Sequence, residues 1–532
     1  MTSTQTSPET TERELPGRVD VLVVGAGLSG IGAAHRIQRA NPQAELVIVE
    51  ARGATGGTWD LFRYPGVRSD SDMFTLSFPF RPWQGRRAIA DGADILDYIR
   101  DTARESGLER IIHTGCRVVA ASWSTDEQEW TVQIDTAEGR RVVRAGFVHL
   151  GSGYYNYEKT HDPAFVGVED FAGEVVHPQF WPEGLDHTGK RVVVIGSGAT
   201  AVTVVPVVAR TAAHVTMLQR TPSYVFDVPG VDPFVQALRR WLSPRAVQSA
   251  ARVKNLGMQY FLYELSRARP KAANAIVLRQ LRRHLPQDVI DEHFTPPYNV
   301  WDQRLCAVPD GDFYASIRRG RADVVTGHID RFVPEGVRLT DGRVVEADIV
   351  VTATGLLLQL LGGIELTVDG ERVAMDRSFA YRGLMLSGVP NLTMTVGYVN
   401  ASWTLRADLV STYVGDLIAH LRDRGLGVAV PVAPDGMSAG PILDLTAGYV
   451  QRAVARFPKV GDRAPWTMPQ NYVKDKIAFS RADVTEAMHF LPVGAKGATL
   501  PRGAQAPASL DLPGSSSNAD DSAGDLVLED VR

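Results

Sequence analysis

The chain has 532 residues and a formal net charge of −5, and this length predicts two or three domains. The near-neutral charge balance gives no reason to expect binding to nucleic acid. Two cysteines, Cys116 and Cys306, lie far apart in the sequence, which excludes a disulfide framework and any C-x-x-C redox or zinc motif. This cysteine usage favours a reducing cytoplasm.

Residues 1–17 are polar and rich in Thr, and they predict a disordered tail rather than a secretory signal. The most apolar windows of the chain are too short and too rich in glycine to span a bilayer. We therefore expect a soluble, cytoplasmic protein.

The first predicted unit begins with the apolar run VDVLVVG, which indicates a buried strand. It leads directly into Gly25-x-Gly27-x-x-Gly30, with Ser29 inside the motif, and then into a helix of small residues. The glycines permit a tight turn and let a pyrophosphate approach the helix N-terminus. The next strand, ELVIVE, ends at Glu50, where a carboxylate can accept hydrogen bonds from ribose hydroxyls. This unit is predicted to hold a dinucleotide with a free ribose diol.

A second unit of the same kind begins at RVVVIGSGATAV. Its turn carries the motif G-x-G-x-x-A and comprises Gly196, Ser197, Gly198, Ala199, Thr200 and Ala201. The following strand ends in Gln219, Arg220 and Thr221 instead of an acid. An arginine can bind a 2′-phosphate through two hydrogen bonds, whereas a carboxylate would repel it. This second unit is therefore predicted to prefer NADPH.

The stretch at about 231–295 is helical in its spacing and rich in arginine. A solvated helical insertion is the favoured interpretation, and contact with a membrane surface or an acidic partner stays open.

Two dinucleotide units in one chain indicate a flavoprotein that receives hydride from NADPH. A later strand, Ala347–Gly355, and the segment 389–403 are predicted to complete the flavin domain. The expected fold class is α/β, with two Rossmann-like dinucleotide-binding domains, for FAD and NADP, and a helical insertion. A disulfide reductase is excluded because the chain has no cysteine pair.

Two longer motifs carry a specific resemblance. GGTWDLFRYPGVRSD, at 56–70, and Phe171-x-Gly173-x-x-x-His177-x-x-x-Trp181-Pro182 are similar to the two fingerprints of the Baeyer–Villiger monooxygenases. The stretches NVWDQRLCAVPDGDFY and VGYVNASWTLRADLV resemble the ethionamide-activating subgroup of that family. The resemblance extends from about residue 19 to about residue 484.

The resemblance implies FAD and NADPH as cofactors, and O2 and a ketone as substrates. In this family oxygen is activated as a flavin C4a-peroxide, and attack on the ketone carbonyl gives an ester or a lactone. By the same carry-over Arg304 is the catalytic arginine, and Asp70 is the carboxylate that orients it. A fixed cation suits a site that stabilises an oxyanion.

The resemblance also implies a set of cofactor contacts. Gly57, Thr58, Trp59, Asp60 and Leu61 are expected along the flavin, Val118 at the adenine end, and Arg68 and Ser69 on the nicotinamide side. The family often has lysine at the position of Gln303, so the 2′-phosphate contact is expected to depend more on Arg220. The linker residue His177 is expected to be structural.

The predicted organisation has six parts: a disordered tail (1–17), the first part of the FAD-binding domain (18–170), a linker (171–182), an NADP-binding domain (183–345), an FAD-domain return segment (346–485) and a flexible acidic tail (486–532). Two alternatives to ketone oxidation stay open. One is a flavin monooxygenase that mainly oxidises sulfur or nitrogen, for example in thioethers or thioamides. The other is a non-catalytic flavin-binding redox sensor. The physiological substrate and the oligomeric state are not predicted.

Overall fold

A computed structural model describes residues 14–443, 445 and 447–508 of the chain. Its larger sheet has the strand order β20-β19-β4-β5-β6-β1-β2-β3, and β23 pairs with β6. The bounds are β1 Arg18–Val24, β2 Leu46–Val49, β3 Ile112–His113, β4 Arg117–Ser124, β5 Glu129–Thr136, β6 Gly139–Leu150, β19 Glu365–Val368, β20 Glu371–Arg372 and β23 Leu392–Met394.

Strand β1 shows why this sheet forms. Its apolar residues are buried on both faces, so the sequence is a continuous apolar run rather than an alternation. Val21 and Val23 pack in one core with helices α1 (Leu28–Ala40), α4 (Gly92–Glu105) and α11 (Trp403–Arg424). Leu22 and Val24 pack in a second core on the opposite face, with Trp123 and other residues of β4 to β6.

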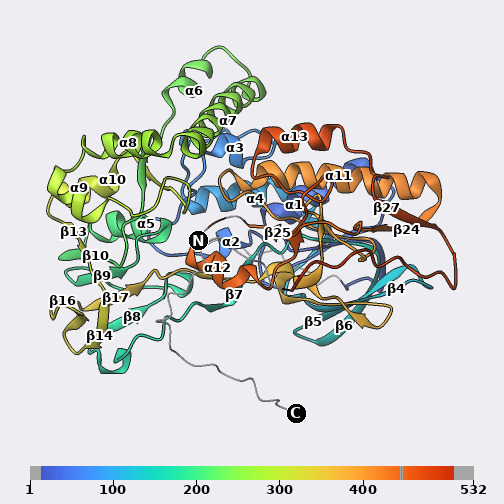
Figure 1. Ribbon diagram of the computed structural model, residues 1–532, viewed down its shortest axis with the longest axis horizontal. Coiled ribbons are helices and arrows are strands. Elements are labelled where there is room, and N and C mark those ends of the chain that lie inside the picture. Colours follow the sequence, from blue (N-terminus) through green and yellow to red (C-terminus); the bar gives the residue numbers. More distant parts are fainter. Residues whose placement is uncertain (1–13, 444, 446, 509–532) are drawn as a thin grey trace, which may run out of the picture.

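The smaller sheet is entirely parallel, with the order β13-β10-β9-β17-β8 (Figure 1). Its strands are β8 Glu174–Val176, β9 Arg191–Ile195, β10 His214–Gln219, β13 Ala322–Thr326 and β17 Ile349–Thr352. Helix α5 (Ala199–Val208) and the helices α8 to α10 cover one face, and the meander β14 to β16 covers the other. The two Rossmann-like units predicted from the sequence are thus both present.

Strand β17 corrects one predicted boundary. The sequence predicts a return segment that begins at 346 and rejoins the flavin unit with a strand at Ala347–Gly355. In the structure the strand found there, β17, lies between β9 and β8 of the smaller sheet, and the chain returns to the larger sheet only at β19. A short apolar strand that is buried on both faces looks the same in either sheet, so its sequence could not settle the choice. Strand β8 likewise lies inside the predicted linker 171–182 and forms the edge of this sheet.

Four helices occupy the segment predicted as an insertion. They are α6 (Pro233–Leu238), α7 (Pro244–Ala268), α8 (Pro270–Leu281) and α9 (Gln287–His293), and α6 and α7 project at the top of Figure 1. Prolines stand at the first position of α6, α7 and α8, where the missing N–H costs no helical hydrogen bond. No helix in the described residues is long and apolar enough to cross a membrane.

The predicted C-terminal tail begins too early at 486. Strand β27 (Met488–Pro492) pairs with β24 (Leu426–Pro431), and Ala506 is buried in the core beside α11. The alternation in this strand is too short to stand out from a loop in the sequence. Residues 509–532 of the tail, and 1–13 of the N-terminal tail, lie outside the described residues.

The remaining elements are short. The helices are α2 Thr58–Leu61, α3 Met73–Leu76, α10 Asp312–Arg318, α12 Gly448–Val454 and α13 Tyr472–Ser480. The strands are β7 Tyr155–Thr160, β11 Val225–Val228, β12 Cys306–Pro309, β14 Ile329–Val333, β15 Gly336–Leu339, β16 Val344–Glu346, β18 Leu356–Leu358, β21 Ala380–Tyr381, β22 Met385–Leu386, β25 Gly440–Pro441 and β26 Lys459–Val460. Single 3-10 turns lie at Glu109–Ile111, Val168–Asp170, Pro178–Phe180, Leu360–Gly363 and Met375–Arg377.

Candidate active site

The turn after β1 opens the N-terminus of α1 into a cavity of about 360 Å³. Gly25 has a φ of +101°, and a Cβ there would lie 2.8 Å from the carbonyl oxygen of Gly151. The backbones of Gly27 and Gly57 approach so closely that a Cβ on Gly57 would lie 3.1 Å from the Cα of Gly27. Within the described part of the chain no side chain caps α1. Its free N–H groups therefore suit a pyrophosphate, which is the fit expected for a dinucleotide.

Glu50 lies at the end of β2, is 5% exposed, and lines the same cavity. Its two carboxylate oxygens accept the N–H groups of Ala26, at 2.7 Å, and of Arg52, at 2.9 Å. Burial raises the pKa of this carboxyl group, although both N–H contacts oppose the shift. The carboxylate is therefore fixed against the glycine turn, where a ribose hydroxyl could donate to it.

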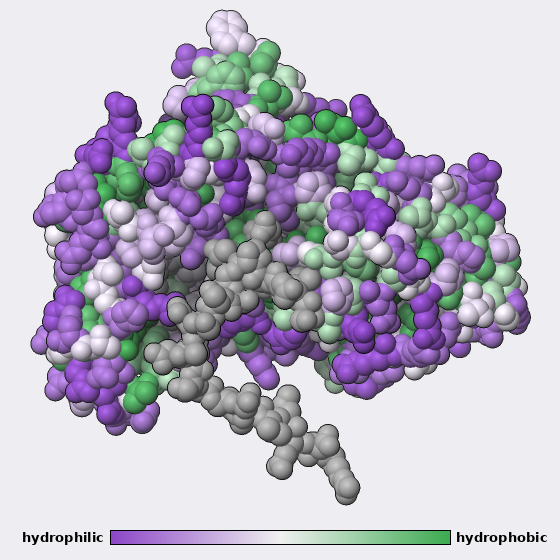
Figure 2. All heavy atoms as spheres, viewed as in Figure 1, coloured by the Kyte–Doolittle hydropathy of each residue, from purple (hydrophilic) through white to green (hydrophobic). Residues whose placement is uncertain are grey.

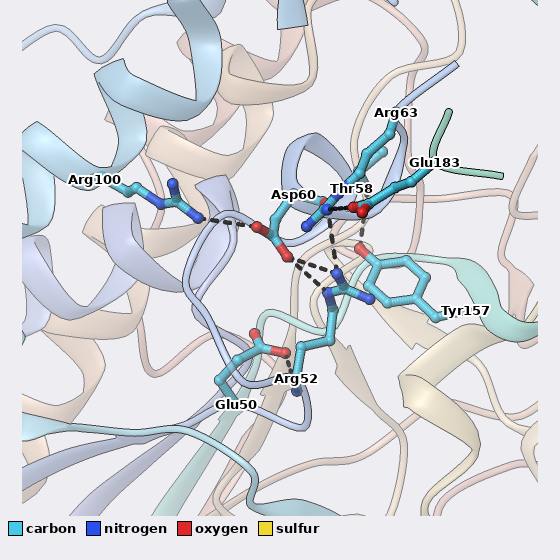
Figure 3. A network of polar contacts seen from close by, with 8 residues as sticks. All are labelled: Glu50, Arg52, Thr58, Asp60, Arg63, Arg100, Tyr157 and Glu183. Carbon is cyan, nitrogen blue, oxygen red and sulfur yellow. Dashed lines mark hydrogen bonds and ion pairs between the residues drawn. The ribbon is translucent and has the colours of Figure 1, made fainter. Parts of the chain in front are cut away.

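Asp60 is held by a polar network instead of lining the cavity (Figure 3). Its carboxylate accepts from Arg52 at 2.6 Å and from Arg100 at 2.9 Å. The hydroxyls of Thr58 and Tyr157 lie 3.0 Å apart in the same network, and both of these residues line the cavity. Of the segment expected along the flavin, Gly57, Thr58 and Trp59 thus reach the cavity, whereas Asp60 and Leu61 are absent from its described lining.

Asp70 and Arg304, far apart in the sequence, meet at the cavity. The Arg304 Nε lies 3.5 Å from a carboxylate oxygen of Asp70. Burial alone would lower the pKa of Arg304, but Asp70 and the nearby tyrosine hydroxyls outweigh it and raise the pKa. The Arg304 side chain keeps 38% of its surface exposed, and it lines the cavity. A permanent cation is therefore presented to whatever the cavity holds.

Arg68 is a second arginine of the cavity wall. Its side chain is 5% exposed and donates to Asp312, the first residue of α10, at 2.6 Å. Two other nitrogens of the guanidinium, Nε and Nη2, are buried and have no hydrogen-bond partner among the described residues. Such orphaned donors are expensive unless a ligand accepts them, so they fit an anionic or carbonyl-bearing cofactor. The neighbouring Ser69 also lines the cavity.

An aromatic wall beside Arg304 was not predicted from the sequence. The rings of Tyr154 and Trp403 stack with centroids 4.9 Å apart, and the hydroxyls of Tyr154 and Tyr155 lie 3.1 Å apart. Trp403 donates its indole N–H to Ser29 at 2.7 Å, which joins the wall to the start of α1. Burial raises the pKa of Tyr155 to about 12. The motif GSGYY directly after β6 was the one local signal that could have indicated these tyrosines.

The second glycine turn brings another helix N-terminus to the cavity. Gly196 has a φ of +130°, Gly198 precedes α5, and Ala199 and Thr200 at the start of that helix line the cavity. The other predicted residues of this unit lie outside the lining: Gly196, Ser197, Gly198, Ala201, Arg220 and Thr221. The Ser197 hydroxyl donates to the carbonyl of Thr221 at 3.1 Å.

Gln219 and Arg220, adjacent at the end of β10, differ in their exposure. Gln219 is buried and donates to the carbonyl of His293 at 2.7 Å, so it is committed to the fold. Arg220 is exposed. Val118 on β4 lines the main cavity at the side of the first unit.

The linker histidine makes a local contact with the backbone. His177 Nδ1 accepts the backbone N–H of Gln179 at 3.1 Å and begins the 3-10 turn Pro178–Phe180. Burial lowers the pKa of this imidazole. His177 is absent from the described cavity lining.

Comparison with known proteins gives two family models along this chain. One, described as flavin-binding monooxygenase-like, matches residues 72–232, and a second, described as an NAD(P)-binding Rossmann-like domain, matches residues 23–85. Among solved structures, an oxidised steroid monooxygenase bound to NADP superposes with a TM-score of 0.70 at 24% identity. That superposition covers 89% of this chain and 100% of the other, and it supports the fold alone.

Sequence relatives are closer. The chain is 48% identical over 460 residues to the FAD-containing monooxygenase EthA of Mycobacterium tuberculosis (strain CDC 1551 / Oshkosh), with 86% of this chain and 94% of the relative covered. It is 43% identical over 463 residues to the probable FAD-binding monooxygenase AlmA of an Acinetobacter species, with 86% and 93% covered. The chain therefore belongs to the EthA-like class B flavin monooxygenases.

Proposed function

We propose that the protein uses FAD, NADPH and O2 to insert one oxygen atom into a ketone, giving an ester or a lactone. The observation that carries this proposal is the pair of Asp70 and Arg304 in a cavity onto which two helix N-termini open. The names of the relatives, which are FAD-containing or FAD-binding monooxygenases, support the cofactor assignment.

The residues around the two turns would hold the cofactors. The start of α1, with Gly25 and Gly27, and the carboxylate of Glu50 would bind the FAD pyrophosphate and ribose. The start of α5 and the orphaned nitrogens of Arg68 would bind NADP. When bound, the two cofactors supply the reducing equivalents and the oxygen activation that the reaction needs.

Arg304 would act on the substrate. As a ketone carbonyl is attacked, negative charge develops on its oxygen, and a preorganised cation beside that oxygen lowers the barrier. Arginine suits this role because it stays protonated at any working pH. Asp70 would keep the guanidinium in place, and the wall of Tyr154, Tyr155 and Trp403 would present an aromatic surface to an apolar substrate.

The test is Arg304→Ala in the FAD-loaded enzyme, supplied with NADPH, air, a panel of ketones and a thioether. We expect ester formation to fall by about 100-fold or more, the typical effect of removing one group that stabilises an oxyanion. Flavin absorbance should be retained. Arg63→Ala is the matched control, since Arg63 pairs with Glu183 at the surface and should leave ester formation unchanged. Products are identified by mass spectrometry.

Three outcomes would change the assignment. If ester formation survives Arg304→Ala, the role of Arg304 is wrong. If the unmodified enzyme yields sulfur oxides and no ester from any ketone, the protein is mainly an S-oxygenase. If it binds FAD but neither consumes NADPH nor forms product, a redox sensor is favoured.

A further inference from the structure

Exposed apolar side chains are concentrated on α6, α7 and the turn between them. Of the sixteen large apolar side chains that are exposed in the described residues, seven lie between 234 and 261: Phe234, Trp241, Leu242, Val253, Met258, Tyr260 and Phe261. Trp241, in the turn, is 85% exposed. Two more, Val473 and Ile477, lie on α13, whose cap residue Asn471 reaches Glu264 of α7. Figure 2 shows hydrophobic spheres gathered at this end of the molecule.

The exposed apolar side chains of α7 lie beyond its first two turns. Val253 and Tyr260, seven residues apart, share one side of the helix, whereas Met258 and Phe261 continue the side that carries Val247 and Ala251. Val247 and Ala251, near the start of the helix, are buried in a core with Phe74 and Ala88. The helix is therefore anchored to the protein through its first turns, and its later apolar side chains are exposed.

The same segment is strongly basic. Residues 234–261 contain five Arg or Lys and no Asp or Glu, in a chain whose net charge is −5. One of the five, Lys254, is already paired with Asp232. Arg240 and Arg245 flank the exposed Trp241 and form no ion pair within the described part of the chain.

Apolar side chains framed by unpaired arginines match an anionic lipid surface. A helix with a basic border and an aromatic and aliphatic stripe lies in the membrane interface, with its apolar side chains among the acyl chains. Each Arg or Lys near the surface adds attraction to anionic lipids. A second copy of this chain is a poorer partner, because two such faces would repel each other by their like charges.

We propose that the face formed by α6, α7 and α13 docks on an anionic lipid bilayer, with Trp241, Val253 and Phe261 inserted in its interface. The chain would lie on the bilayer rather than span it, in keeping with the absence of a spanning helix among the described residues.

A small cavity lies at the base of this face. It has a volume of about 30 Å³ and is lined by Leu256, Gln259, Tyr260 and Tyr263 of α7 together with residues 400–401 and 470–473. Ala401 lines both this cavity and the main one. The proposed docking face therefore adjoins the wall of the main cavity at Ala401.

The test is cosedimentation of the full-length, FAD-loaded protein with phosphatidylcholine vesicles, with and without phosphatidylglycerol, at low and high salt. We expect binding to the anionic vesicles only, weakened by salt. The triple variant Trp241→Ser, Val253→Ser, Phe261→Ser should lose about tenfold or more in affinity. The variant Arg240→Glu, Arg245→Glu should lose at least about fivefold per charge at low salt. NADPH oxidation with a water-soluble substrate should be unchanged in both, which verifies folding.

The matched control is Val142→Ser, Val166→Ser, since these valines are 52% and 61% exposed on other parts of the molecule. It should bind vesicles like the unmodified protein. The proposal is overturned if the unmodified protein stays in the supernatant, or if the control loses as much binding as the triple variant. Self-association that disappears in the triple variant, without vesicle binding, would assign the face to a second copy instead.

Discussion

The helices that follow the two glycine turns of this enzyme pack against those turns at different distances. In the first unit a Cβ on Gly30 would lie 1.7 Å from the carbonyl oxygen of Gly25, so the helix is pressed against the turn. In the second unit the equivalent position is Ala201, which fits and is fully buried. The first unit also fixes an acid, Glu50, at the end of its second strand, whereas the second exposes Arg220 there. The tighter unit thus carries a buried acid at this strand end, and the looser one carries an exposed cation.

The largest expected effect comes from exchanging the residues at this packing position. Gly30→Ala should destabilise the protein by about 4 kcal/mol or more, because backbone must move to admit the methyl group. Ala201→Gly should cost only about 0.5 to 1 kcal/mol, the usual penalty of glycine in a helix. Urea unfolding and bound flavin per chain measure both. Similar losses in the two variants would mean that the turns do not differ in tightness.

A smaller effect on the free energy of unfolding is expected when the pH is lowered. His149 in β6 is fully buried, and burial lowers its pKa to about 4. Its ring contacts the hydroxyls of Thr393, at 2.9 Å, and Thr395, at 3.2 Å. Below pH about 6.5 the unfolded chain binds a proton here that the folded chain refuses until pH about 4. The contribution of His149 to the free energy of unfolding is therefore complete above pH about 6.5. This free energy falls by about 3 kcal/mol as the pH is lowered from there to about 4.

The replacement His149→Gln keeps hydrogen-bonding groups but cannot titrate, so it should flatten this part of the pH dependence in urea unfolding. His214→Gln at the start of β10 is the control in the second sheet, where the ring is partly exposed beside Asp323. An unchanged pH dependence in His149→Gln would show that other groups cause the acid sensitivity.

The smallest expected effect concerns Arg220, the exposed arginine at the end of β10, and the binding of NADPH. Arg220→Ala should raise the KM for NADPH about tenfold, the loss of a charge-assisted contact to the 2′-phosphate. The KM for NADH should stay the same, since NADH has no such phosphate. Arg210→Ala, an exposed arginine just after α5, should alter neither value. An equal rise for both nucleotides after Arg220→Ala would place Arg220 elsewhere in the site.

Local signals in the sequence were enough for the two units and for much of the cavity wall. Both glycine turns, Glu50 and the loop that carries Trp59 and Asp70 follow or precede apolar strands at fixed spacing, and these features survive without tertiary information. Fourteen predicted residues line the cavity: Gly25, Gly27, Ser29, Glu50, Gly57, Thr58, Trp59, Arg68, Ser69, Asp70, Val118, Ala199, Thr200 and Arg304. Their roles toward the cofactors stay predictions.

Contacts between distant segments could not be predicted. Trp403 reaches Ser29 across 374 residues, and its stacking on Tyr154 depends on how α11 packs on α1. Asp60 lies in the middle of a motif expected to bind the flavin, yet its carboxylate accepts hydrogen bonds from Arg52 and Arg100 instead. In each case three-dimensional packing decides between partners that the sequence offers equally.

The late strand β17 has a consequence for biosynthesis. It fills the smaller sheet between β9 and β8, and α11 covers the larger sheet only with residues 403–424. A ribosome making about 5 to 20 residues per second needs roughly 20 to 80 seconds between the emergence of β1 and the end of α11. Throughout that interval the larger sheet is unfinished and has an exposed apolar face, and until β17 emerges the smaller sheet is unfinished as well. Its yield in a cell should therefore depend on chaperones that bind during translation.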